Sequence, residues 1–375
     1  MKMTKRNKKS VIPNYRAVMA NQQLSRCKIA SMVVAEDSDG EDNLWAEHEN
    51  LRKDFNKFYE ENSQLNKITK GKARDNTIDN HKVNSNSINS VSTTSVPINN
   101  SKSFSYLDLK VKIADKMSRH CHFCEKACNV DRRYVKGECG VGDPLIASEF
   151  LHVGEEPPLV PSHTVFLAGC NFNCVYCQNW DISQQPNRGI TISEENLALI
   201  IGKRRSEGSR NVNFVGGDPT SNLPYILRTM QLVKENIPVV WNSNLYLSHD
   251  AMHLLDGFAD LYLTDFKYGN NECARRLSGI HDYMEVVGRN HLMAWKAGDM
   301  IIRHLILPNH VECCSKPILD WISENLGLKT VLNIMGQYRP VYHASEYREI
   351  SRHLLPPELE EVIQHAQDLG FKNLI

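Results

Sequence analysis

Short apolar runs alternate with amphipathic stretches of helical period over the C-terminal part of the chain. The runs are predicted strands, and they cover Thr164–Ala168, Val212–Val215, Pro238–Trp241, Leu261–Asp265, Ile301–Leu307 and Thr330–Ile334. Helices are expected near Glu194–Arg205, Leu223–Glu235, His249–Gly257, Tyr283–Lys296, Ser315–Leu326 and Glu358–Leu369. Such alternation indicates an α/β fold, in which a parallel sheet is joined by crossover helices. Six units are fewer than the eight that close a TIM barrel.

The first 104 residues have a different pattern. Val83–Asn100 is rich in Ser, Asn and Thr, which is typical of a flexible linker. A helix is predicted over 42–68, where apolar residues recur at steps of seven, four, three and seven. That stripe comprises Leu44, Leu51, Phe55, Phe58 and Leu65. It suits a partner helix or self-association, and it equally suits docking on the helix's own domain.

Three regions follow from this organisation. We expect a largely disordered extension over 1–104 that contains the helix at 42–68, a cysteine-rich leader over 105–160, and a core domain over 161–375. Within the leader, Phe150–Pro158 is interpreted as a connection into the first strand of the core, because Pro157 and Pro158 end any regular element.

Charge and hydropathy narrow the possible partners. The chain has 44 basic and 44 acidic side chains, so its net charge indicates neither nucleic acid nor a membrane surface as a partner. No stretch approaches the length of apolar sequence that spans a bilayer, and the N-terminus lacks an apolar signal segment. We therefore expect a soluble, cytoplasmic protein.

Seven of the eleven cysteines fall in two compact groups, which indicates metal ligation in a reducing compartment. The first group has the spacing C-x2-C-x3-C-x10-C and consists of Cys121, Cys124, Cys128 and Cys139. Four thiolates suit a closed tetrahedral zinc site or, equally, an iron–sulfur cluster. The remaining cysteines, Cys27, Cys273, Cys313 and Cys314, show no metal spacing and are interpreted as ordinary thiols.

The second group has the spacing C-x3-C-x2-C and directly follows the first predicted strand. It consists of Cys170, Cys174 and Cys177. A four-iron cluster normally has four thiolate ligands, so three leave one iron open for chemistry. The alternatives are an incomplete zinc knuckle and reduced thiols packed in a core. The polar residues around these cysteines favour a loop over a packed strand.

Thr164–Asp181, which reads TVFLAGCNFNCVYCQNWD, resembles the radical S-adenosylmethionine (SAM) superfamily. The stretch GCNFNCVYCQNWDIS is similar to the branch related to pyruvate formate-lyase activating enzymes. The resemblance implies a partial (β/α)6 TIM-type barrel, which matches the six predicted units. It also implies that Cys170, Cys174 and Cys177 hold a [4Fe–4S] cluster, that its open iron binds SAM, and that Tyr176 lies near the adenine.

The predicted strand ends carry further candidates, because barrel enzymes place their chemistry at the carboxyl ends of the strands. Gly216, Gly217 and Asp218 stand where the superfamily usually has Gly-Gly-Glu, whose backbone and acid engage the SAM amino group. Asp218 is one methylene shorter, which leaves the backbone role intact and the side-chain role less certain. Asn242 stands where activating enzymes commonly have an acid that binds a cation, so we do not transfer cation binding.

Two cations complete the set that the resemblance implies. Lys267 is expected to reach the SAM carboxylate, with Asp265 orienting it, and Arg303 is expected to pair with SAM because a buried arginine needs an anion. His304 is interpreted as a core histidine. The stretch Met335–Pro340 is expected to close the substrate side, with Tyr338 as a candidate there.

The resemblance implies a radical SAM oxidoreductase that reductively cleaves SAM to a 5′-deoxyadenosyl radical for hydrogen abstraction. One electron would come from flavodoxin or ferredoxin. Activating enzymes take hydrogen from a glycine of a partner enzyme, so a protein substrate of this kind is one candidate. No catalytic side chain is assigned. The second hypothesis is a non-catalytic iron–sulfur or zinc protein that works in electron transfer or binding.

Overall fold

The computed structural model describes residues 11–72 and 103–375, without the side chains of residues 62–72. The predicted linker Val83–Asn100 lies outside the described residues.

A single open sheet forms the centre of the protein, with its strands in the order of the sequence. The strands are β1 (Ile146–His152), β2 (Ser162–Leu167), β3 (Val212–Gly216), β4 (Val239–Ser243), β5 (Leu261–Asp265), β6 (Asp299–Leu305), β7 (Val331–Met335) and β8 (Asn373–Leu374). All neighbours from β2 to β8 pair in parallel, and β1 pairs antiparallel with β2. The prediction of an α/β fold with a partial parallel barrel is confirmed.

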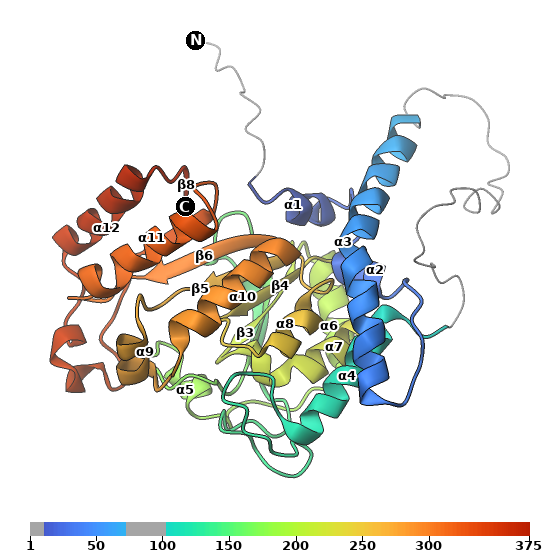
Figure 1. Cartoon of the computed structure of the whole chain (residues 1–375), viewed down its shortest axis with the longest axis horizontal. Helices are drawn as coiled ribbons and strands as arrows, with labels where there is room; N and C mark the ends of the chain where they lie inside the picture. The colour runs from blue at the N-terminus through green and yellow to red at the C-terminus, as the bar shows by residue number, and fades with distance from the viewer. Residues whose placement is uncertain (1–10, 73–102) are drawn as a thin grey trace.

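Crossover helices cover the outer face of the sheet (Figure 1). They are α6 (Glu194–Ser206), α7 (Leu223–Leu232), α8 (His249–Leu255), α10 (Tyr283–Ala297), α11 (Lys316–Asn325) and α12 (Pro356–Leu369). Each corresponds to a predicted helix. Serine caps fix two of the starts, since Ser193 accepts a hydrogen bond from Asn196 N and Ser248 accepts one from Ala251 N. Two short helices, α5 (Trp180–Ser183) and α9 (Asn271–Ser278), lie in the loops at the carboxyl ends of the strands.

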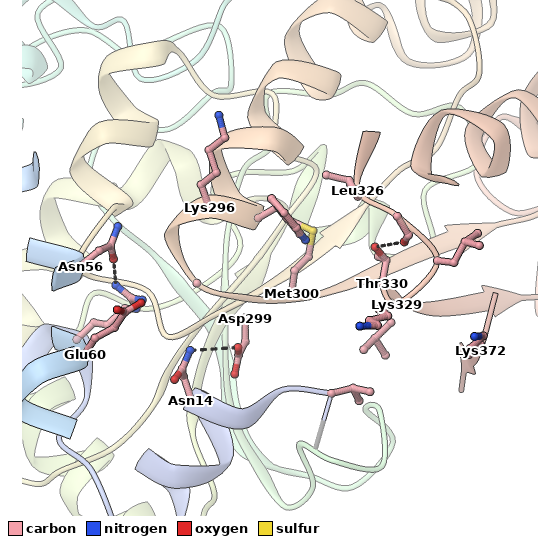
Figure 2. Close-up of a pocket in the computed structure, with 17 residues that line it drawn as sticks. Asn14, Asn56, Glu60, Lys296, Asp299, Met300, Leu326, Lys329, Thr330 and Lys372 are labelled. Carbon is pink, nitrogen blue, oxygen red and sulfur yellow. Dashed lines mark hydrogen bonds between the residues drawn. The ribbon is translucent and has the colours of Figure 1, made fainter. Parts of the chain in front are cut away.

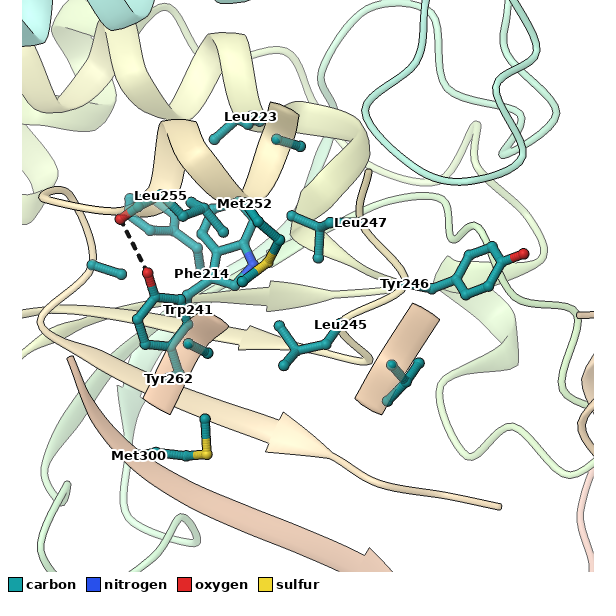
Figure 3. Close-up of a cluster of buried hydrophobic side chains, with 14 of the residues drawn as sticks. Phe214, Leu223, Trp241, Leu245, Tyr246, Leu247, Met252, Leu255, Tyr262 and Met300 are labelled. Atoms are coloured by element: carbon teal, nitrogen blue, oxygen red, sulfur yellow. Dashed lines mark hydrogen bonds between the residues drawn. The ribbon is translucent and has the colours of Figure 1, made fainter. Parts of the chain in front are cut away.

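The core between sheet and helices is rich in aromatic side chains (Figure 3). Phe214, Trp241 and Tyr262 come from three neighbouring strands and are fully buried. The Tyr262 hydroxyl donates to Leu255 O on α8 at 3.1 Å, so its polar end is satisfied inside the core. This packing fixes the strands whose far ends carry the candidate site.

Strand β1 corrects one expectation from the sequence. Phe150–Pro158 was interpreted as a connection, yet residues 150–152 belong to a strand that pairs with β2 at the sheet edge. The Phe150 ring stacks on Phe166 across the pair, with centroids 5.6 Å apart. The strand ends at His152, before the prolines, and residues 153–155 bend away from it. That bend places the two glutamates that follow β1 inside the barrel.

The described part of the N-terminal region is packed against the barrel. It forms α1 (Pro13–Met19), α2 (Arg26–Ala30) and the first part of α3 (Glu41–Lys72), whereas the sequence suggested a largely disordered extension. Ile12 and Tyr15 join a buried cluster with side chains from β4 to β7, so they plug the amino end of the barrel. Tyr15 N donates to Asp299 Oδ2 at 2.8 Å. The domain boundaries at 104 and 160 stay a prediction.

The predicted helix at 42–68 lies within α3, which packs against α4 (Tyr106–Met117). Leu44 and Phe55 of its stripe are buried, and so is His48, which lies between them in the sequence. Among the described side chains, docking on the helix's own domain is thus the observed arrangement. The side chain of Leu65 lies outside the described residues.

A cavity of about 720 Å³ lies beside the plug (Figure 2). Asn14, Asn56 and Glu60 from the N-terminal helices face Asp299 and Met300 at the start of β6. This cavity is at the amino ends of the strands, far from the cysteine loop. No helix among residues 11–72 and 103–375 is long and apolar enough to cross a membrane.

Candidate functional site

A cavity of about 300 Å³ opens at the carboxyl ends of the parallel strands. All nine residues that the resemblance implies as contacts of the cluster or SAM line it: Cys170, Cys174, Tyr176, Cys177, Gly216, Gly217, Asp218, Lys267 and Arg303. They come from the ends of β2, β3, β5 and β6. The order of the strands in the sheet therefore brings together residues that are up to 133 positions apart in the sequence.

The cysteine loop follows β2, and each of its three thiols has a polar neighbour. Phe172 N donates to the Cys170 sulfur at 3.3 Å, and the Ser278 hydroxyl donates to the Cys174 sulfur at 2.9 Å. The Cys177 sulfur lies 3.1 Å from the Ser183 hydroxyl. Hydrogen-bond donors around a sulfur are the usual surroundings of a metal-bound thiolate.

The three sulfurs fit an iron–sulfur cluster better than a single ion. Burial raises the pKa of Cys170 well above its ordinary value, and it raises the pKa of Cys174 to about 11. Such thiols stay neutral unless a metal draws off the proton. Within the described residues, these three are not among the groups whose ligand atoms all lie within 4.8 Å of one another, the spacing of a single ion. A cube with one iron at each ligated corner keeps its thiolates further apart, so the donor set suits a [4Fe–4S] cluster.

Gly216 and Gly217 hold β3 against the cysteine loop. Gly216 has φ +131°, and a Cβ on it would lie 2.0 Å from Leu167 O. A Cβ on Gly217 would lie 2.0 Å from Gly169 O. Gly217 N and Asp218 N donate to these two carbonyls at 2.9 Å. The glycines are thus needed for close approach of two backbone segments, in addition to lining the cavity.

Asp218, which follows β3, is joined by hydrogen bonds to the end of β4. Its carboxylate accepts hydrogen bonds from Thr220 N at 2.9 Å, the Ser243 hydroxyl at 2.9 Å and Asn244 N at 3.0 Å. Burial raises its pKa, and these donors oppose the rise. Both carboxylate oxygens and the backbone N–H of Asp218 are therefore used inside the protein.

Lys267, Asp265 and Arg303 form a chain of half-buried charges across β5 and β6. Lys267 Nζ lies 2.6 Å from Asp265 Oδ2, and Arg303 Nε donates to Asp265 Oδ1 at 2.8 Å. Burial raises the pKa of Asp265, but the two cations outweigh it and lower the pKa to about 2. Asn242 Oδ1 accepts a further hydrogen bond from Arg303 at 2.5 Å. Asp265 thus holds both cations, Asn242 holds Arg303 as well, and both cations line the cavity.

Two glutamates after β1 belong to the same site, although the sequence did not indicate them. Arg303 lies 3.7 Å from Glu155, and Glu156 accepts a hydrogen bond from Asn333 at 2.9 Å. They line a second cavity of about 460 Å³ that shares Asn242, Arg303 and other residues with the first. The preceding stretch IASEFLH does not alternate with period 2, so hydrophobic periodicity gave no signal for a strand that leads to these glutamates.

The tyrosines differ in role. Tyr176 is buried, and its hydroxyl donates to Tyr268 at 2.8 Å. The Tyr338 hydroxyl donates to Ile350 O at 2.6 Å, so it serves the packing of the C-terminal loop, whereas Met335 and Gln337 line both cavities. His304 bonds Phe266 O and Ser315 at 2.8 Å each. The interpretation of His304 as a core histidine is confirmed.

The leader cysteines lie near one another, outside the barrel. A Cβ on Gly137 would be 3.3 Å from the Cys139 sulfur and 3.4 Å from the Cys128 sulfur. Arg132 donates to the Cys121 sulfur at 3.6 Å. Like the cysteine loop, this group lacks single-ion spacing among the described residues. Whether it holds a metal stays a prediction.

The fold adds a group of cysteines that the spacing in the sequence does not indicate. Cys273, Cys313 and Cys314, interpreted from the sequence as ordinary thiols, have sulfurs within 4.8 Å of one another and of a His310 nitrogen. Only the folded chain brings these residues together, because Cys273 is on α9 whereas His310, Cys313 and Cys314 follow β6.

An open parallel barrel with three cysteines after its first parallel strand is the architecture of a radical SAM core. Residues 164–322 match the sequence profile of the Radical SAM superfamily. The chain is 51% identical over 267 residues to the uncharacterized protein MJ0674 of Methanocaldococcus jannaschii, and the match covers 70% of this chain and 78% of that protein. It is 24% identical over 281 residues to the uncharacterized protein MJ0808 of the same organism, with 70% and 80% covered. The chain belongs to the radical SAM superfamily.

Parts of solved structures also match this chain, at low sequence identity. Streptococcus suis SuiB bound to S-adenosylmethionine is 13% identical, with a TM-score of 0.41, and the match covers 55% of this chain and 47% of SuiB. TYW1 with a lysine–pyruvate adduct bound is also 13% identical, with a TM-score of 0.39, and covers 61% of this chain and 84% of TYW1.

Proposed function

We propose that this protein is an oxidoreductase of the radical SAM superfamily that uses Cys170, Cys174 and Cys177 to hold a [4Fe–4S] cluster. The observation that carries the proposal is the shared cavity: the three thiols, the glycine turn of β3 and the cations of β5 and β6 all line it. When bound, the cluster and SAM supply reductive cleavage of SAM and a 5′-deoxyadenosyl radical that abstracts hydrogen.

The chain's own residues bind and orient SAM in this proposal. Lys267 and Arg303 offer cationic donors to the SAM carboxylate, and Asp265 fixes their positions. The backbone of Gly216 and Gly217 faces the amino group, and Tyr176 borders the adenine. The buried aromatic wall of Phe172, Tyr176 and Tyr268 excludes water from the cavity.

We place the substrate in the second cavity, next to Glu155 and Glu156. Glu156 Oε2 and Asn242 Nδ2 are buried there without a hydrogen-bond partner among the described residues. Unpaired buried polar atoms favour a polar occupant. The glycine loop of a partner enzyme is the candidate that the likeness to activating enzymes suggests, because its peptide groups supply both donors and acceptors.

Partner and location are part of the proposal. The reducing electron would come from a flavodoxin or ferredoxin. A cytoplasmic location is supported by the cysteines, all eleven of which are free, since thiols and clusters persist in reducing compartments.

The test is anaerobic reconstitution with iron and sulfide, followed by dithionite and SAM. We expect 5′-deoxyadenosine and methionine from the wild type. Cys174→Ala should abolish this product, and Cys27→Ala is the matched control because Cys27 is equally buried on α2. A wild type that binds iron but makes no 5′-deoxyadenosine would favour the electron carrier. Product formation stimulated by a glycyl radical enzyme, with a glycyl EPR signal, tests the substrate.

A further inference from the structure

A second group of thiols lies beside the barrel, outside the cavity described above. Cys273, at the start of α9, meets His310, Cys313 and Cys314, which follow β6. The sulfur of Cys273 is 3.6 Å from His310 Nδ1 and 4.0 Å from the Cys313 sulfur. His310 Nδ1 is 3.3 Å from the Cys313 sulfur and 3.6 Å from the Cys314 sulfur. The last two sulfurs are 3.9 Å apart.

These distances are those of a tetrahedral metal site. With Zn–S near 2.3 Å and Zn–N near 2.05 Å, a regular tetrahedron separates two sulfurs by about 3.8 Å and a sulfur from a nitrogen by about 3.6 Å. The observed sulfur pairs of 3.9 and 4.0 Å, and the sulfur–nitrogen pairs of 3.3 to 3.6 Å, agree with both. Three thiolates and one imidazole form a closed structural zinc set.

The backbone is shaped to bring these ligands together. Val311–Ser315 forms a π-helical turn, η3, which is a rare form frequent at functional sites. Asn309, just before His310, has φ +61°. The loop after β5 approaches η3 so closely that a Cβ on Gly269 would lie 2.7 Å from Cys314 O. The loop after β5 and the turn η3 are thus held in close backbone contact beside the proposed ligands.

A residue outside the ligand set joins the two loops. Asn270 Nδ2 donates to Cys313 O at 2.7 Å and lies 3.9 Å from the Cys314 sulfur, while Asn270 Oδ1 caps α9 by accepting from Cys273 N at 2.8 Å. Such outer contacts orient metal ligands. We propose that Cys273, His310, Cys313 and Cys314 bind one structural Zn²⁺ ion.

The ion would fix a loop that serves the candidate active site. The loop between β5 and α9 carries Lys267 at one end and Cys273 at the other. Helix α9 then ends at Ser278, whose hydroxyl donates to the Cys174 sulfur and whose carbonyl accepts from Asn173 N at 3.0 Å. Zinc would therefore anchor the base of the segment that contacts the cysteine loop, without touching SAM itself.

The first experiment counts zinc in the full-length chain by elemental analysis and native mass spectrometry. We expect Cys313→Ser and Cys273→Ser each to contain one zinc ion per chain fewer than the wild type. Cys313 is the most exposed of the four, so its replacement disturbs folding least. The matched control is Cys27→Ser, which should retain the ion.

A second variant separates this site from the other cysteine groups. In this variant the seven cysteines of the leader and the cysteine loop are replaced by alanine, which removes both of those cysteine groups. We expect one zinc per chain to remain. Cobalt(II) in that variant should show the visible bands of tetrahedral thiolate coordination and lose them in Cys313→Ser. Zinc that disappears with the leader cysteines, or persists when Cys273 and Cys313 are both replaced, would overturn the assignment. Neither result bears on SAM cleavage, so the two proposals fail separately.

Discussion

Asp265 is the carboxylate between two half-buried cations, and its replacement by asparagine gives the sharpest test of the site's electrostatics. Asp265→Asn keeps the shape and removes the charge, which leaves Lys267 and Arg303 without their shared anion. Removing one partner of a buried ion pair costs about 3–5 kcal/mol. Partial exposure of the carboxylate, 22%, and the nearby Glu155 reduce that figure. We expect a loss near the lower end of this range or slightly below it.

The pKa of Asp265 gives an independent magnitude. Its pKa falls from 3.8 to about 2 on folding, because the two cations outweigh burial. A shift of that size corresponds to about 2.5 kcal/mol. With an unfolding entropy of roughly 0.7 kcal/mol/K for a chain of this size, the loss lowers Tm by about 4 °C at pH 7.

The pH dependence has a fixed sign. A carboxyl whose folded pKa is depressed stabilises the protein above the unfolded pKa, and this contribution disappears as pH falls through the folded pKa. The difference between wild type and Asp265→Asn should therefore be constant from pH 5 to 8 and shrink to roughly half near pH 3.

The assay is thermal unfolding followed by circular dichroism, with both chains in the same metal state. Asp320→Asn is the control: this residue also forms a contact of 2.8 Å, with His365, but its carboxylate is 47% exposed. Exposed pairs contribute at most about 1 kcal/mol. A change below about 1 °C for Asp265→Asn at pH 7 would refute the view that Asp265 neutralises the two cations.

Three further predictions test other parts of the structure. Ser278→Ala removes a donor to the Cys174 sulfur; since such donors stabilise the reduced cluster, the midpoint potential should become more negative with iron content unchanged. Gly217→Ala places a Cβ 2.0 Å from Gly169 O, so iron content after reconstitution should fall several-fold. Burial raises the pKa of Asp260 to about 7. Its contribution to the free energy of unfolding is therefore largest below pH 4 and falls by up to about 4 kcal/mol as pH rises to 7. In urea titrations, Asp260→Asn should remove that decline.

Each of these has a contradicting result. An unchanged potential in EPR-monitored titration of Ser278→Ala would mean that the hydroxyl does not bond the cluster sulfur. Full iron content in Gly217→Ala would mean that the two backbone segments can separate without loss of the site. A wild type whose urea midpoint is flat from pH 5 to 8 would mean that Asp260 is not titrating in that range.

Local patterns predicted the parallel barrel because each strand and crossover helix carries its own signal. Val212–Val215 and Leu261–Asp265 are short apolar runs between helical stretches, and the observed strands β3 and β5 start at the same residues. The site residues were predicted from the resemblance to a family, which places them at or near the carboxyl ends of the strands. Lys267 lies just after β5, whereas Arg303 lies within β6. The plug was not predicted, because Ile12 and Tyr15 are isolated apolar residues whose burial depends on the open end of a barrel far along the sequence.

Asp218 shows where a motif and a structure diverge. Its position after two glycines matches a family pattern, but the motif says nothing of what β4 presents to it. Ser243 and Asn244 arrive from 25 and 26 residues further on and use the carboxylate. A side-chain role that depends on a neighbouring strand's loop therefore cannot be assigned from the motif alone, whereas a backbone role can.

The group around His310 shows why compact spacing finds some metal sites and misses others. His310, Cys313 and Cys314 are three of the four proposed ligands and lie within five consecutive residues, so their spacing is visible in the sequence. The fourth ligand is 37 residues earlier on α9 and is brought there by the pairing of β5 with β6. Loops that follow neighbouring parallel strands emerge at the same edge of the sheet. An incomplete ligand set after one strand therefore predicts the missing ligand in the loop that follows a neighbouring strand. Applied to the loop before β6, that rule selects Cys273, the one cysteine in residues 266–298.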